Sequence, residues 1–356
     1  MAVGIDVGTN SVKGVVLKKK NEKIILDNYF IARTNDSLIK IGQPGVISDF
    51  TGKIIKESLD NAGIKSSSMN VAIPSFTSLI ITIDVSNIPN KNFEMAVRRE
   101  VAKYIPVKID GVVYDWQIIN ESDFADNENG ANERANRFAV DKSDKMVKIL
   151  VVAIMKEISE RYDKVFSAEG LDIDLLEIDS ISLTRALTRN KKGVYLILDI
   201  GHEVSNILVA SQHGVLVNRT IDVGGDRMTK AIADSMNVTL ERAEELKRTQ
   251  GVNVGVEHGS EGFLATVLTV IINEVKKTIE LFKSDFNNLE IEEVLLSGGT
   301  ARMVGLSSLI AQQTGLKVSI GNSLEGIFFV PEIKNSLQVA APSLNIAIGL
   351  ALAHFE

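Results

Sequence analysis

A duplicated pattern constrains the fold of this chain more than any other feature of its sequence. Residues 3–17 and residues 194–209 each read as an apolar strand, an Asp-x-Gly turn with short polar residues after it, and a second apolar strand. This pattern predicts a β-hairpin with a carboxylate and a glycine at its bend. The copies lie in different halves of the chain, too far apart for the short period of a solenoid repeat. They therefore predict two similar lobes, each opening with the same hairpin.

A third signal follows the second hairpin. Residues 294–300, Val-Leu-Leu-Ser-Gly-Gly-Thr, predict a buried strand and a double-glycine turn, with an amphipathic helix from Ala301 that ends near Gly315. One Asp-x-Gly carries little information, but two such hairpins and a strand–Gly-Gly–helix form a rare combination. Glycines let backbone N–H groups approach phosphate oxygens closely. The combination therefore predicts a nucleotide clamp.

The two hairpin aspartates add a metal to this prediction. Asp6 and Asp199 would face each other across the clamp, where a carboxylate repels phosphate unless a cation bridges them. Mg²⁺ suits that position, because it takes one or two carboxylates, phosphate oxygens and several waters. We expect both aspartates to hold Mg²⁺ mainly through water.

A smaller pattern separates the hairpins. Strands are expected at 82–86, 112–119 and 147–154, and helices at 93–104 and 156–168. Their order, β-α-β-β-α, predicts a compact α+β insertion. The segment 120–146, rich in asparagine and acidic residues, is expected to be a surface loop without function of its own.

Composition excludes several classes of function. The chain has no cysteine and only four scattered histidines, which excludes disulfide scaffolds, iron–sulfur clusters, thiolate zinc sites and cysteine nucleophiles, and argues against a multi-histidine metal site. The net charge of −7 gives no electrostatic footprint for nucleic acid. The longest apolar runs, 149–155 and 346–353, are much shorter than the roughly 20 residues of a membrane span. We expect a cytoplasmic protein that reaches the inner membrane only through a partner.

The three motifs resemble those of the actin-like ATPase superfamily: phosphate 1 (Asp6, Gly8, Thr9, Lys13), phosphate 2 (Asp199, Gly201, Ser205) and adenosine (Gly298, Gly299). Within it, residues 72–75, 92–106, 114–119, 223–229 and 243–247 resemble the PilM family of type IV pilus assembly, and the likeness runs over essentially the whole chain. The resemblance implies an α/β fold of two duplicated lobes around a nucleotide cleft. The first lobe would comprise 1–80, 171–192 and 336–356, the insertion 81–170, as the 1C subdomain shared with FtsA, and the second lobe 193–335.

The resemblance also implies the residues that bind ATP. They are Gly8, Thr9, Asn10 and Lys13 on the first loop, Gly201, His202 and Ser205 on the second, Gly225, Glu244 and Lys247 in the second lobe, and Gly298, Gly299 and Arg302 beside the adenosine. Plainer explanations stand beside some of these roles. Lys13 is equally explained as a solvated surface charge, solvated charges are the usual explanation for Glu244 and Lys247 on a charged helix face, and His202 is better explained as a turn residue.

Hydrolysis requires a residue that orients water against the γ-phosphate. In actin-like ATPases this residue follows the insertion, where Asp179 is the candidate and Glu177 the second choice. The side chain of Asp179 is shorter than the Glu or Gln of active relatives. We therefore expect ATP binding with slow or undetectable turnover.

The resemblance implies a pilus adaptor whose partner is the N-terminal cytoplasmic peptide of a PilN-like inner-membrane protein, bound between the first lobe and the insertion. Candidate contacts are Arg98, Arg99, Ala102 and Tyr104, although the arginines equally fit a solvated helix face. Pilus ATPases, the platform protein and self-association are further expected interactions; nucleic-acid binding and direct membrane insertion are not expected. Two alternatives are an FtsA-like division protein, whose amphipathic C-terminal membrane helix is missing from residues 350–356, and a small-molecule kinase, whose cysteine-rich zinc motif is absent.

Overall fold

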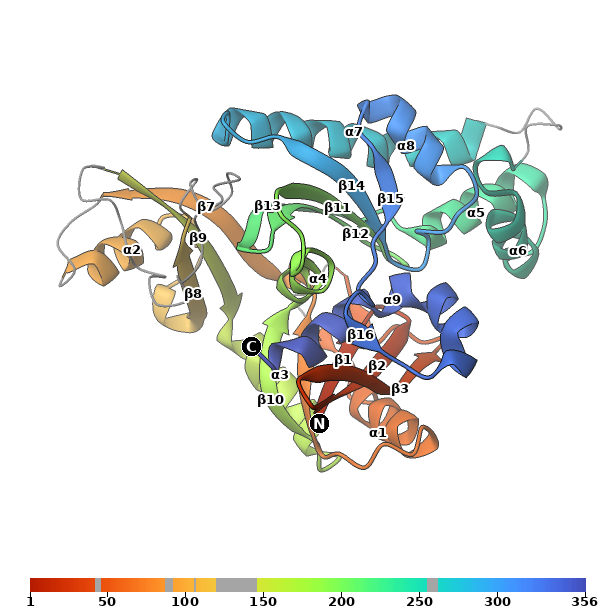
Figure 1. Cartoon of the computed structure of the whole chain (residues 1–356). Helices are drawn as coiled ribbons and strands as arrows, with labels where there is room; N and C mark the ends of the chain where they lie inside the picture. The colour runs from red at the N-terminus through yellow and green to blue at the C-terminus, as the bar shows by residue number, and fades with distance from the viewer. Residues whose placement is uncertain (42–45, 87–91, 106, 120–145, 255–261) are drawn as a thin grey trace.

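The computed structural model describes residues 1–41, 46–86, 92–105, 107–119, 146–254 and 262–356, so nearly all of the expected loop 120–146 lies outside the described residues. Figure 1 shows two lobes, each built on one β-sheet, with a smaller unit beside them. Two helices, α4 and α9, lie between the sheets at the centre of the molecule.

The first sheet has the strand order β10-β6-β1-β2-β3-β16. β1, β2 and β3 form an antiparallel meander, whereas β6 runs parallel to β1 and β10 runs parallel to β6. The strands are β1 (Ala2–Val7), β2 (Ser11–Lys20), β3 (Lys23–Arg33), β6 (Ser68–Ile73), β10 (Asp172–Ile178) and β16 (Ile327–Phe328). The short pair β4 (Ile39–Lys40) and β5 (Val46–Ile47) and the helix α1 (Thr51–Asn61) complete this part of the chain.

The second sheet repeats this topology in the order β13-β12-β11-β14-β15. Again three strands form an antiparallel meander, and two more follow in parallel on the other side. The strands are β11 (Val194–Ile200), β12 (Ser205–Ser211), β13 (Gly214–Ile221), β14 (Ile291–Ser297) and β15 (Val318–Ile320). β12 is buried along its whole length, as its apolar run predicts for a strand covered on both faces. The duplication expected from the two hairpins is thus confirmed in the strand order.

Four helices cover the second sheet: α5 (Gly225–Met236), α6 (Leu240–Gln250), α7 (Gly262–Asp285) and α8 (Leu306–Thr314). α8 begins later than we expected, because residues 301–305 form turns and Gly305 takes a positive φ of 79° before the first helical residue. Its end at Gly315, with a φ of 73°, agrees with the prediction.

The insertion contains a three-stranded sheet in the order β7-β9-β8, formed by β7 (Ser78–Ser86), β8 (Val112–Ile118) and β9 (Met146–Met155). Its helix α2 (Phe93–Val101) buries Phe93, Val97 and Val101 in a separate small core. We assigned α3 (Lys156–Ser167) to the insertion, yet its buried Tyr162 and Phe166 pack with residues of β1 and β6 in the first lobe. The exact domain boundaries stay a prediction.

The central helices α4 (Asp179–Thr188) and α9 (Lys334–Ala353) divide their packing between the sheets. α9 packs on β1 and β2, where a Cβ at Gly4 would overlap the Ala347 carbonyl, and α4 packs on β11 and β12 of the second sheet. The two helices touch so closely that a Cβ at Gly349 would overlap the Ser182 carbonyl. Among the described residues, the segment 331–353 is long and apolar enough to span a membrane, but 67% of its most apolar window is buried inside the protein. This burial identifies α9 as a core helix of the fold.

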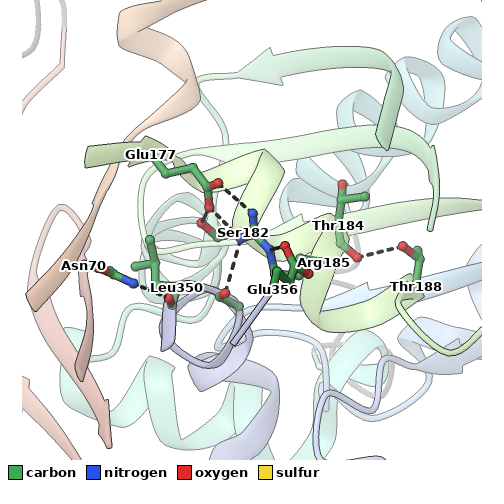
Figure 2. A network of polar contacts seen from close by, with 9 residues as sticks. Asn70, Glu177, Ser182, Thr184, Arg185, Thr188, Leu350 and Glu356 are labelled. Carbon is green, nitrogen blue, oxygen red and sulfur yellow. Dashed lines mark hydrogen bonds and ion pairs between the residues drawn. The ribbon is translucent and has the colours of Figure 1, made fainter. Parts of the chain in front are cut away.

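A polar network fastens these helices to the first sheet (Figure 2). Arg185 of α4 forms two 2.7 Å ion-pair contacts with Glu177 at the end of β10, and it also contacts Glu356 at 2.9 Å. Asn70 of β6 donates a 2.8 Å hydrogen bond to the Leu350 carbonyl of α9. These contacts therefore tie α4 to β10 and α9 to β6 of the first sheet.

Candidate nucleotide site

The first hairpin turn is tightly held by its own backbone. The Gly8 N–H donates to the Ser11 carbonyl at 2.9 Å, and the Thr9 and Asn10 carbonyls accept from residues that follow β3. Lys13 of β2 lies beside Asp6 of β1, with 2.8 Å between Nζ and Oδ2, and its side chain is only 18% exposed. The low exposure of Lys13 and its ion pair with Asp6 disfavour the explanation that Lys13 is a solvated surface charge. The Thr9 hydroxyl is buried and has no hydrogen-bond partner among the described residues, so it is available to a ligand.

The second hairpin turn is tied to the start of α5. The Gly201 N–H donates to the Val204 carbonyl at 3.0 Å, and the Gly201 and His202 carbonyls accept from the N–H groups of Gly225 and Asp226 at 2.9 and 2.8 Å. Burial lowers the pKa of His202, whose contribution here is a backbone one. The hydroxyl of the fully buried Ser205 donates to the Val223 carbonyl at 2.6 Å, so it supports the loop from behind.

Lys247 is buried, at 6% exposure, which excludes the solvated helix face that we considered for it. Its ammonium group donates to the Gly225 carbonyl at 2.9 Å and to the Thr229 hydroxyl at 2.8 Å, and it pairs with Glu244 at 2.6 Å. Burial alone would raise the pKa of the half-exposed Glu244, but hydrogen bonds with Lys247 and Thr229 lower it. The pair thus holds the loop that contains Gly225.

The double-glycine turn lies against the second hairpin. Gly298 has a φ of 87°, and a Cβ there would overlap the Ile200 backbone, so the turn requires glycine at this position. Gly299 has open space, with the Ser343 hydroxyl 3.8 Å from an added Cβ. Arg302 is exposed and donates to the Gln338 carbonyl of α9 at 2.6 Å. A Cβ on Gly225 would lie 2.7 Å from the Thr300 hydroxyl, so the turn and the start of α5 are neighbours.

Three buried carboxylates meet between these turns. Asp6, Asp179 and Asp199 are 5%, 8% and 8% exposed. Burial raises the pKa of Asp199 to about 6, and the nearby Asp6 charge adds to it, while a hydrogen bond with Ser297 and the charge of Lys13 oppose it. Burial raises the pKa of Asp179 to about 7, and the charges of Asp199 and Asp6 add to it against the hydrogen bonds from Ser75. The cluster therefore carries more negative charge than Lys13 alone offsets.

The donor set fits one magnesium ion bound with a nucleotide. No group of three or more His, Asp or Glu side chains in the described part of the chain is arranged to hold a metal by itself. A cation here would take Asp6 and Asp199 as partners and fill its remaining positions with water and phosphate oxygens, as Mg²⁺ does. Such a cation would also oppose the burial and the Asp6 charge that raise the pKa of Asp199.

The two candidates for water activation have different partners. Asp179 accepts hydrogen bonds from the Ser75 N–H at 3.1 Å, from the Ser75 hydroxyl, and from the Asn206 amide at 3.3 Å. Glu177 is neutralised by Arg185 and accepts a hydrogen bond from Ser182, so it is not free to act on water. Sequence reasoning missed Ser75 and Asn206, although Asn206 could have been noticed as a buried amide at the start of a strand that continues with four apolar residues.

Comparisons with known proteins agree with this geometry. A family model described as type IV pilus assembly protein PilM matches residues 4–355. A chain of a solved PilM–PilN type IV pilus biogenesis complex superposes with a TM-score of 0.79 at 25% identity, covering 100% of this chain and 98% of that one.

More distant relatives share the fold. MreB5 of Spiroplasma citri, solved with AMPPNP, has a TM-score of 0.52 at 12% identity and covers 98% of this chain and 93% of its own. The cell division protein FtsA of Staphylococcus epidermidis is 23% identical over 380 residues, covering 96% of this chain and 78% of its own. The expected actin-like α/β fold is confirmed, and the match over nearly the whole sequence shows that this chain belongs to the PilM family of type IV pilus assembly proteins.

Proposed function

We propose that this protein is an ATP-binding adaptor of type IV pilus assembly, which works in the cytoplasm and reaches the inner membrane through a PilN-like partner. The observation that carries the proposal is the cluster of Asp6, Asp179 and Asp199 between two glycine turns, beside a single paired lysine. Buried carboxylates with a single cation beside them favour a further bound cation, and glycine turns, where no Cβ blocks the approach of phosphate oxygens to the backbone, favour phosphate.

The candidate residues would contact different parts of the nucleotide. Gly8, Thr9, Asn10 and Lys13 would contact the terminal phosphates, and the backbone of Gly201 and His202 would do so from the other lobe. Gly225 with Glu244 and Lys247 would lie beside the ribose, and Gly298, Gly299 and Arg302 beside the base. Mg²⁺ would neutralise phosphate charge next to Asp6 and Asp199.

Hydrolysis is slow or absent in this proposal. Asp179 has a shorter side chain than the Glu or Gln of active relatives, and hydrogen bonds from Ser75 and Asn206 hold its carboxylate in place. Phosphate release should therefore stay close to that of a control without protein. Rapid release that is lost in Asp179→Ala would contradict this.

The proposed partner is the N-terminal cytoplasmic peptide of a PilN-like protein, and the similarity to a chain of a PilM–PilN complex supports a partner of this kind. The exposed face of α2 and the residues after it offer contacts: Arg98, which pairs with Asp110 at 2.6 Å but stays half exposed, together with Arg99, Ala102 and Tyr104. Pilus ATPases, the platform protein and a second copy of this chain are further proposed partners.

Two binding measurements test the proposal. Calorimetry with ATP and Mg²⁺ should give binding that weakens at least tenfold in Asp199→Ala. A synthetic peptide with the PilN-like N-terminal sequence should bind the wild type, bind Tyr104→Ala/Arg99→Ala more weakly, and bind the control Leu281→Ala, changed on the exposed face of α7, as the wild type does. Absence of peptide binding with and without ATP would remove the adaptor function.

The FtsA-like alternative is supported only by distant identity, and it predicts filaments on lipid vesicles. The kinase alternative predicts phosphate transfer to a small molecule in a coupled assay over a panel of sugars. Either result would replace the adaptor proposal.

A further inference from the structure

The insertion is attached to the first lobe by two connections. Its first strand, β7, is entered through the turn Ser75–Thr77, and its strand β9 ends at Met155, directly before the first residue of α3. A change in the position of the insertion must pass through one or both of these connections.

One of these connections contacts Asp179 directly. The turn does so through Ser75, whose N–H and hydroxyl both donate to one carboxylate oxygen of Asp179. The other connection leads into α3, which contains Tyr162; this residue is fully buried and its hydroxyl has no hydrogen-bond partner among the described residues. Burial raises the pKa of this phenol, and the charges of Asp179 and Asp6 add to the effect.

The other carboxylate oxygen of Asp179 connects to the second lobe. It accepts from Asn206, which follows the second hairpin turn on β12, and Asn206 in turn accepts from Thr220 of β13 at 2.8 Å. The insertion also touches β13, because the Thr82 hydroxyl donates to the Leu216 carbonyl at 3.0 Å. The contacts therefore form a closed circuit from the insertion through Asp179 to the second lobe and back.

We propose that Asp179 couples nucleotide binding to the position of the insertion, with Ser75 and Asn206 as positioning residues on its two sides. The inference rests on the proposed nucleotide binding. A ligand that draws the two hairpin turns together moves Asn206 relative to Ser75, and a buried carboxylate between them loses one partner unless the insertion follows. Linkage then requires the reverse effect, so a peptide on the insertion changes nucleotide affinity by the same factor.

Hydrogen–deuterium exchange of β7 to β9, measured with and without ATP and Mg²⁺, tests the coupling. In the wild type the nucleotide should change the exchange rates there, and it should change the affinity for the peptide by roughly 5- to 150-fold, the usual range of an allosteric coupling. In Ser75→Ala the change should fall to less than a third of that. Thr77→Val is the control. The Thr77 hydroxyl lies in the same turn but donates to the Pro74 carbonyl rather than to Asp179, so this variant should respond as the wild type does.

Two further readouts keep the outcomes distinct. Trp116, the sole tryptophan, packs edge-on against Phe93 at 5.4 Å inside the insertion, so its fluorescence should follow the same pattern. Asn206→Ala should reduce the response from the opposite side if Ser75→Ala does not fold. Nucleotide binding without any change in exchange, or a full response in both variants, overturns the coupling alone. No nucleotide binding in calorimetry overturns the proposed function and the coupling with it.

Discussion

Replacing Asp179 by asparagine should flatten the pH dependence of stability in the nucleotide-free protein. Burial raises the pKa of Asp179 from 3.8 to about 7, so the folded state holds this proton more tightly than the unfolded chain. Ionisation therefore destabilises the fold. The penalty is absent below pH 3.8, grows as the pH rises, and is complete above about pH 7.

The size of the penalty follows from the shift. A difference of about three pH units, at about 1.4 kcal/mol per unit, makes the wild type about 4 kcal/mol less stable at pH 8 than at pH 4 through this group alone. Because the side chain is only 8% exposed, solvent screening reduces this value little. The free energy of unfolding of a globular domain is roughly 5–15 kcal/mol, so this penalty is a large part of it.

Asparagine can replace this aspartate without breaking its contacts. Its carbonyl oxygen can keep both hydrogen bonds from Ser75, but its amide would face the Asn206 amide, donor against donor. A flip of the Asn206 amide resolves the conflict, because the Thr220 hydroxyl that donates to it can also accept. The variant should therefore lose only about 1 kcal/mol at low pH.

Urea unfolding between pH 5 and pH 8 in EDTA measures the effect. As the pH rises from 5 to 8, the urea midpoint of the wild type should fall steadily. The midpoint of Asp179→Asn should fall only between pH 5 and about pH 6, where Asp199 loses its proton, and should then stay constant. The exposed Asp172 on β10 provides the control, since Asp172→Asn should keep the wild-type profile. Parallel profiles for the wild type and Asp179→Asn would refute the argument from burial.

Other predictions concern the turns and the cation. Gly298→Ala should destabilise the protein by about 3 kcal/mol or more in urea, whereas Gly315→Ala, at a similar positive φ but in open space, should cost only about 1 kcal/mol. Lys13→Met leaves Asp6 without its cation and should weaken ATP binding by roughly 10- to 100-fold in calorimetry, since a charged hydrogen bond contributes about 1.5–3 kcal/mol. Lys247→Met removes a buried ammonium group that contacts the start of α5 and pairs with the half-exposed Glu244, so it should lower both the urea midpoint and the ATP affinity; an unchanged ATP affinity would contradict this role. Removing Mg²⁺ with EDTA should weaken ATP binding at least tenfold, and equal binding would exclude the metal.

Sequence alone predicted the parts of the fold that local pattern specifies. The two Asp-x-Gly turns, the strand before Gly298 and the buried face of α2 all follow from apolar periodicity and from the needs of glycine. The predicted start of α8 was wrong, because the turn at 301–305 has the same apolar spacing as a first helical turn. The packing of α3 on the first lobe was missed because an amphipathic helix does not indicate which core its apolar face joins.

The candidate site was less accessible from sequence, because its contacts join distant segments. Lys247 lies on a helix with many charges, and only the tertiary structure shows that it is buried against the Gly225 carbonyl. Ser205 has the expected residue type, but its hydroxyl supports Val223. Position in a motif thus predicted which segments meet, while the direction of each side chain depends on packing that no local pattern contains.

Glu177 and Asp179 show what decides the role of an acidic residue at this point of the fold. The two carboxylates are separated by one residue: Glu177 lies near the end of β10, and Asp179 is the first residue of α4. Glu177 points to Arg185, with which it shares two 2.7 Å contacts, so its charge is neutralised and the pair fastens α4 to the sheet. Asp179 has only neutral hydrogen-bond donors and two negative neighbours, so its charge is uncompensated and responds to any cation, proton or lobe movement nearby. A residue in that state can sense the nucleotide, whereas one paired like Glu177 can only hold the fold that positions it.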